Sequence, residues 1–212
     1  HASISVAENL PDPAFTLIGN TNEFIVRPFA FDLGFPVNYD SADESGSKFV
    51  SAGTPFPMTI RAVNWQSEDD SNNDGFPDVG SDVSNNSVTP NFGQELSTSN
   101  QILTITSSLN LPSTGTSGAL SATVIKTSAS DGFFTAGITE PAASLTWDEV
   151  GIINVNVHLD NYLAASGANI LGDKNNVGRF YPDYFTLVSS DLSDSCGTFS
   201  YMDQPDIDIT YT

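Results

Sequence analysis

The sequence has few positive charges. Only 6 of its 212 residues are lysine or arginine, against 26 aspartates and glutamates, which gives a formal net charge of −20. Nucleic acids and anionic membranes bind proteins through basic residues that neutralise phosphate, so neither is an expected partner. Salt screens the mutual repulsion of so many carboxylates. The charge therefore favours a protein exported into salty or calcium-bearing water.

Cysteine, histidine and long apolar runs are also scarce. Cys196 is the single cysteine, so it is either a free thiol or paired with a cysteine outside these residues. No apolar run approaches the roughly 20 residues of a membrane span, and we expect no membrane insertion. The two histidines are accompanied by no G-x-S-x-G elbow, phosphate loop or paired-cysteine metal site. We therefore expect a non-enzymatic protein.

Short alternating segments rich in β-branched and aromatic residues dominate what is present, and Ser, Asn, Gly and Pro separate them. Such alternation predicts half-buried strands, and clusters such as LPSTGTSG and GDKNN predict turns. The expected fold is all-β, an immunoglobulin-like antiparallel β-sandwich with long loops. At most one short helix is expected, within LDNYLAASGANI. The expected strands lie within 23–31, 56–65, 101–109, 119–127, 151–163, 178–190 and 207–212.

A weak similarity between two parts of the sequence indicates a tandem architecture. GTPFPMTIRA at 53–62 resembles DQPDIDITYT at 203–212, and VRPFAFDL lies upstream of the first as GRFYPDYFTL lies upstream of the second. We predict an N-terminal segment with a leading strand at 1–33, a main sandwich at 34–190, and a C-terminal strand at 191–212 that starts the next module. The alternatives are that this strand completes its own sheet, or that it pairs with a neighbouring subunit.

The most acidic stretch is SEDDSNNDGFPDVGSD, a loop at 67–82 with six acidic residues and no basic one. Oxygen-bearing side chains at alternate positions, a glycine and then a backbone carbonyl form the spacing of a calcium loop. We predict a structural Ca²⁺ site there, with Glu68 or Asp69 available to complete the shell. The alternative is a solvated acidic insertion of ordinary turn residues. The predicted ligands are Asp70, Asn72, Asp74, Phe76 through its carbonyl, Asp78 and Asp82.

Two other functions need different residues. A carbohydrate-binding module would need a flat platform of exposed aromatics, for which the candidates are Trp65, Tyr181, Tyr184 and Tyr201; core packing is the commoner fate of such residues.

A copper-dependent polysaccharide monooxygenase would chelate copper with the amine and ring of His1 and with His158, near Tyr162. We favour the interpretation that His1 is a purification-tag remnant and that His158 is an ordinary strand residue.

Several longer phrases occur in a fixed order: VRPFAFDL, VTPNFG, WDEVGII, VGRFYPDYFTL and CGTFSYMDQP. Together they resemble the C-terminal β-rich region of MshQ-like proteins of the mannose-sensitive haemagglutinin type IV pilus locus. The resemblance implies an exported, multi-domain protein at the surface of a Gram-negative bacterium, with an adhesive or pilus-associated role. It further implies neighbouring modules, pilus components or surface glycans as partners. No catalytic residues are implied.

Overall fold

In a computed structural model, the strands among the described residues form three sheets. The structure describes residues 2–6, 15–19, 24–36, 38, 43, 45–95, 102–126, 134–139, 142–194, 198–199, 202 and 209–211. Its elements are β1 (Ala2–Val6), β2 (Phe15–Gly19), β3 (Ala30–Gly34), β4 (Phe56–Val63), η1 (Val83–Asn85), β5 (Ile102–Leu111), β6 (Val124–Lys126), β7 (Phe134–Thr135), β8 (Ile138–Thr139), β9 (Ala143–Leu145), β10 (Gly151–Leu159), η2 (Tyr162–Ala164), β11 (Ile170–Phe180), β12 (Ser190–Leu192) and β13 (Ile209–Tyr211).

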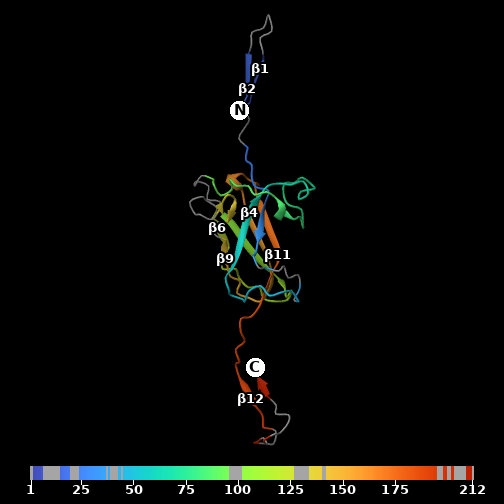
Figure 1. The fold of residues 1–212 in the computed structure, drawn as a ribbon, viewed down its shortest axis with the longest axis vertical. Helices are drawn as coiled ribbons and strands as arrows, with labels where there is room; N and C mark the ends of the chain where they lie inside the picture. The colour runs from blue at the N-terminus through green and yellow to red at the C-terminus, as the bar shows by residue number, and fades with distance from the viewer. Residues whose placement is uncertain are drawn as a thin grey trace.

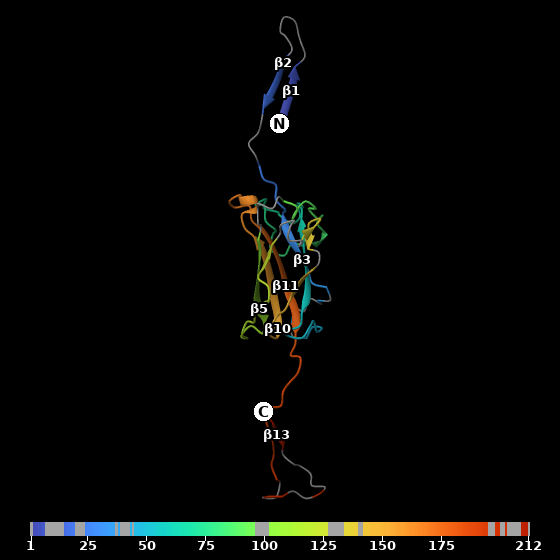
Figure 2. The same ribbon diagram turned by 90° about the vertical axis from the view of Figure 1, so that its left-hand side faces the viewer.

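The central body is one nine-stranded sheet that curls around its own core (Figures 1 and 2). Its strand order is β6-β5-β10-β11-β3-β4-β8-β7, and β9 also pairs with β4. Most neighbours are antiparallel, whereas β11 and β3 meet in parallel at Leu171 and Ala30. Trp147, just after β9, bridges to Leu120, just before β6. The two sides of the curled sheet therefore meet, which leaves fewer open strand edges.

Alternating apolar residues build the core, as β4 illustrates. In FPMTIRAV, Phe56, Met58, Ile60 and Ala62 are buried, and the residues between them, from Pro57 to Arg61, are more exposed, because successive side chains of a strand point to opposite faces. Phenylalanine rings then fill the space between the two sides of the body. The ring of Phe56 lies 5.3 Å from each of two other buried phenylalanine rings, centroid to centroid.

Two small antiparallel hairpins lie beyond opposite ends of the central body. Strand β1 pairs with β2, and β12 pairs with β13. Figures 1 and 2 show the β1–β2 hairpin beyond one end of the long axis and the β12–β13 hairpin beyond the other. Neither hairpin joins the nine-stranded sheet. A two-stranded hairpin is at best marginally stable in water. Its outer strand edges can also form hydrogen bonds with a further strand.

The all-β class is confirmed, since the helices among the described residues are the single 3₁₀ turns η1 and η2. The immunoglobulin-like topology stays a prediction, as does the division into domains. Strand β3 spans the boundary placed after residue 33 and belongs to the central sheet. The terminal strand Ile209–Tyr211 pairs with Ser190–Leu192. Within the described part of the chain, no helix is long and apolar enough to cross a membrane.

Several predicted element bounds are wrong. GDKNN at 172–176, predicted as a turn, lies inside β11, because pairing with the apolar strand β10 outweighs the weak strand propensity of Asn and Asp. The expected strand at 23–31 begins only at Ala30, after Pro28, and the expected strand at 178–190 ends before Pro182, so that residues 182–189 lie outside the strands. Proline has no N–H with which to continue a ladder.

Candidate cation-binding loop

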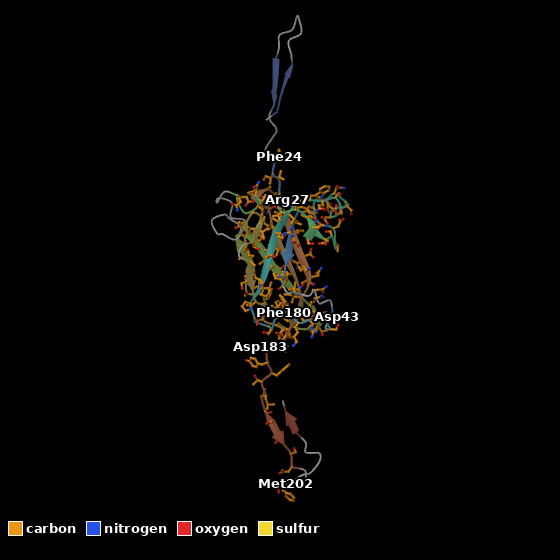
Figure 3. The ribbon with its side chains drawn as sticks, viewed as in Figure 1. Phe24, Arg27, Asp43, Phe180, Asp183 and Met202 are labelled. Atoms are coloured by element: carbon orange, nitrogen blue, oxygen red, sulfur yellow. The ribbon has the colours of Figure 1, made fainter. Side chains whose placement is uncertain are left out.

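The acidic loop follows β4 and ends at the 3₁₀ turn η1. It lies at the same end of the central body as Arg27, because the Arg27 guanidinium donates a hydrogen bond to the carbonyl of Gly75 over 2.6 Å (Figure 3). The curled sheet thus brings the segment before β3 against the segment after β4. These two strands are antiparallel neighbours, so the start of one lies beside the end of the other.

Asp70 is the anchor of the loop and is only 3% exposed. Its Oδ1 accepts the backbone N–H of Asp74 at 3.0 Å. Its Oδ2 accepts the indole N–H of Trp65 and the backbone N–H of Gly75, both at 3.1 Å. A buried carboxylate requires such donors, since burial without them is costly. The first predicted ligand therefore also orders the loop through hydrogen bonds.

Asn72 and Asp74 continue the same pattern along the loop. The side chain of Asn72 accepts the N–H of Asp74 at 2.9 Å, and that of Asp74 accepts the N–H of Phe76 at 2.9 Å. Side-chain acceptors that bond amides two residues later are typical of Asx turns. Gly75 has a φ of +86°, a conformation that glycine adopts without steric cost. The structure therefore brings the first three predicted side-chain ligands into one turn.

Asp78 and Asp82 have local partners of their own. Asp78 Oδ2 accepts the hydroxyl of Ser71 at 2.6 Å and its N–H at 2.9 Å, and these bonds lower the pKa of Asp78. Asp82 caps η1 by accepting the N–H of Ser84 at 3.0 Å. Hydrogen bonds from the side chain and backbone of Ser84 lower the pKa of Asp82. Hydrogen bonds to the charged form favour ionisation, so both carboxylates stay charged well into the acidic range.

Asp69 points to a different partner from Asp70. Its Oδ2 accepts the side-chain amide of Asn86 at 2.8 Å, and that amide also donates to the carbonyl of Asn64 at 2.9 Å. Both Asp69 and Asn86 are buried. The backbone carbonyl of Asp69 accepts the N–H of Asp78 at 2.7 Å. Asp69 therefore fastens the base of the loop to the chain that follows η1.

Arg27 is the residue of this site that sequence reasoning missed. Its guanidinium lies 5.1 Å from the centre of the Phe76 ring and donates to the carbonyls of Pro28 and Phe29 as well as Gly75. Burial lowers the pKa of Arg27, but arginine stays protonated at physiological pH. An internal cation thus sits against the acidic loop. Its position in VRPFAF, far from the loop in sequence, carried no local signal.

The loop fits a calcium ion in part. Carboxylate, amide and carbonyl oxygens are the ligands that calcium prefers, and a carboxylate oxygen that accepts one hydrogen bond keeps a second lone pair. Among the described residues, however, no three His, Cys, Asp or Glu side chains gather closely enough to hold a metal ion. Asp70, Asn72 and Asp74 lie in one turn, and the set of six predicted ligands stays a prediction.

The candidate aromatic residues lie at opposite ends of the body. Trp65 is 49% exposed and bonded to Asp70 at the acidic-loop end. Tyr181 and Tyr184 follow Phe180, which Figure 3 places at the other end together with Asp183. Tyr181 lies against the Lys48 ammonium, 5.0 Å from ring centre to nitrogen. Trp65 and these tyrosines therefore share no single platform. Tyr201 lies outside the described residues.

Two of the three copper candidates, His158 and Tyr162, lie within the described residues. His158 lies in β10, with its Nε2 3.9 Å from Asp160 Oδ2. Tyr162 is buried, and its hydroxyl donates to Glu95 Oε1 at 2.5 Å. Burial, followed by the hydrogen bond and the charge of Glu95, raises the pKa of Tyr162. His1 and Cys196 lie outside the described residues, so the structure does not address their predicted roles.

The fold and the loop define an all-β protein with an acidic, hydrogen-bonded loop at one end of a curled sheet. Family comparison identifies it further: residues 27–137 match the family model DUF6701, second domain, and residues 149–212 match DUF6701, third domain. The chain therefore belongs to the DUF6701 family. Comparison with curated proteins and with solved structures gives no significant match. The two matched regions share one sheet, since β10 and β11, from residues 149–212, lie between β5 and β3, from residues 27–137.

Proposed function

We propose that the chain is a non-enzymatic module of an extracellular, pilus-associated or cell-surface adhesin. The linear order of hairpin, body and hairpin along one long axis carries the proposal (Figure 1). A module with pairing strands beyond both ends fits a row of similar modules. The resemblance to MshQ-like proteins, the net charge of −20 and the scarcity of cysteine and histidine support the same proposal.

Surface display is tested on intact cells of the bacterium that makes the protein. An antibody raised against the purified chain should label unpermeabilised cells, and added protease should remove the label. An antibody against a periplasmic protein, applied to the same cells, serves as the control for leakage through the outer membrane. Labelling that appears only after permeabilisation would contradict the extracellular proposal.

We further propose that the acidic loop holds one structural calcium ion. The buried Asp70, the Asx turns at Asn72 and Asp74 and the left-handed Gly75 support the proposal, because they arrange oxygens around one tight turn. The ion would stabilise the loop between β4 and η1. Binding to the folded state alone raises stability by about 2.7 kcal/mol when calcium is at 100 times its Kd.

Thermal unfolding of metal-stripped protein measures this effect. For a chain of this size, about 2.7 kcal/mol corresponds to a midpoint rise of about 5–11 °C. Magnesium at equal ionic strength should give much less. Asp74→Ala should abolish the rise, whereas Asp43→Ala should keep it, since the Asp43 carboxylate accepts hydrogen bonds from Ser45 at the other end of the body. Equal shifts with both metals would refute the site.

Glycan binding at Trp65 is the second candidate. The indole is half exposed, and its N–H is held by Asp70, so the ring is pre-organised to stack on a sugar. Calorimetric titration with oligosaccharides, repeated with Trp65→Ala, tests it. Heat that persists in the variant would exclude Trp65 as the binding residue.

A further inference from the structure

Residues Tyr184 to Val188 form an apolar segment that is largely exposed. Tyr184, Phe185, Leu187 and Val188 are 76%, 90%, 61% and 81% exposed. The segment leads directly into β12 but belongs to no strand in the described part of the chain. Its apolar residues fall at both odd and even positions, so an extended chain would present apolar side chains on both faces. A segment of this kind fits a strand that is covered by other elements.

The same segment is built like β3, a strand that is covered. When Pro182 is aligned with Pro28, Phe185 and Leu187 fall at the positions of Phe31 and Leu33. Phe31 is 0% exposed and Leu33 is 4% exposed. Strand β3 also pairs antiparallel with β4, as β12 pairs with β13. The C-terminal segment therefore repeats the β3–β4 hairpin without the core that covers it.

In the central body, β11 lies beside β3 in the same sheet, with a close contact between the two backbones. The two strands run parallel, with Leu171 opposite Ala30. Gly172 makes the approach possible, because a Cβ at this position would lie 2.3 Å from the carbonyl oxygen of Phe31. A larger residue at 172 would push the strands apart. This glycine is therefore a marker of the junction between a β11-type strand and a β3-type strand.

The N-terminal hairpin carries the same marker, and among the described strands β2 pairs with β1 alone. LIG at 17–19 matches ILG at 170–172, and each stretch lies in the second strand of an antiparallel hairpin. Gly19 takes the place of Gly172. A Cβ built on Gly19 would meet no atom within 4 Å, and Gly19 has no left-handed φ that would require glycine. Neither crowding nor backbone conformation among the described residues requires glycine here, whereas a docked β3-type strand would.

We propose that the β1–β2 hairpin of one copy docks on residues 184–188 of a second copy and reproduces the β11–β3 junction. Gly19 would then face Phe185 as Gly172 faces Phe31. The β1–β2 hairpin and the segment at 184–188 lie beyond opposite ends of the central body along its long axis (Figure 2). The contact between two copies is therefore head-to-tail. Strands β1 and β2 and residues 184–188 contain no charged residue, so in a chain of net charge −20 these segments approach each other with the least repulsion.

This inference deepens the proposed row of modules by naming a second copy as the neighbour. It does not depend on calcium or on surface display. Its failure would leave the module proposal standing with a different domain as the neighbour, whereas intracellular location would contradict the module proposal and leave self-association unaffected. The two experiments therefore fail independently.

Light scattering after size-exclusion chromatography tests the contact on the whole 212-residue chain. A small interface of this kind associates between about 1 µM and about 1 mM. The average mass should rise above the 22.5 kDa of the monomer with concentration, and more so in added salt, which screens the repulsion between carboxylates. A monomer throughout this range would overturn the proposal.

Two single variants and their mixture define the geometry. Gly19→Val should keep the unfolding midpoint and remain monomeric, since its side chain enters open space in the free chain. Thr16→Val in the same strand is the control and should assemble normally. Phe185→Asp should also be monomeric. An equimolar mixture of Gly19→Val and Phe185→Asp should stop at dimers, because each retains one intact end. Normal assembly of Gly19→Val would refute the head-to-tail contact.

Discussion

Replacing Asp70 with alanine tests whether hydrogen bonds alone order the acidic loop. The substitution removes an acceptor of three N–H groups, from Trp65, Asp74 and Gly75, of which the Asp74 N–H keeps Asn72 as a second acceptor. A hydrogen bond to a charged group contributes about 1.5–3 kcal/mol when buried. Trp65 and Asp74 are exposed and Gly75 is partly exposed, so water replaces much of each lost bond. We expect a total loss of about 2–4 kcal/mol in unfolding free energy.

The assay is urea or thermal unfolding in a chelator, so that no metal contributes. The expected loss corresponds to a midpoint drop of about 4–16 °C for a chain of this size. Asp74→Ala should cost clearly less, because Asp74 accepts only the N–H of Phe76 and the exposed amide of Asn72. A drop for Asp70→Ala no larger than that for Asp74→Ala would refute the reading of Asp70 as the anchor.

Three further changes probe the core, the acid range and the internal cation. Phe56→Ala should cost about 3–5 kcal/mol in chemical denaturation, because it opens a cavity in the buried phenylalanine cluster; a loss under about 1 kcal/mol would contradict that packing. Since the pKa of Asp78 is lowered in the folded state, its ionised form stabilises the fold above the ordinary value of 3.8, and this contribution is lost as pH falls through the folded-state pKa. Asp78→Asn should therefore flatten the acid limb of the unfolding midpoint, and an unchanged limb would exclude this group. Arg27→Gln should speed hydrogen exchange of the Gly75 region without altering that of β5, since it weakens the hydrogen bond to the Gly75 carbonyl. Unchanged exchange would show that the loop keeps its conformation without Arg27.

Strand existence was predictable wherever apolar residues alternate. In β4 and β10 the alternation in FPMTIRAV and the apolar residues of GIINVNVHL correspond to buried positions. The turn residues of the acidic loop were also predictable, because Asp, Asn and Gly favour Asx turns and left-handed conformations through local bonds. These features depend on neighbours only a few residues away.

Features that depend on distant segments were missed. GDKNN became part of β11 because β10 supplies the pairing, and Arg27 reached Gly75 because β3 and β4 lie side by side. The six predicted oxygen ligands of the acidic loop stay a prediction.

The sequence by itself determined the all-β class, the acidic character and the turn at Gly75, since local propensity, charge and short-range hydrogen bonds are properties of adjacent residues. Only the tertiary structure decided that the regions matching two family domains share one sheet, that Asp70 is buried, and that Phe31 is covered while Phe185 is exposed. Closely similar stretches of sequence have different burial because burial depends on what packs against a strand, and β3 lies beside β11, which is far along the chain.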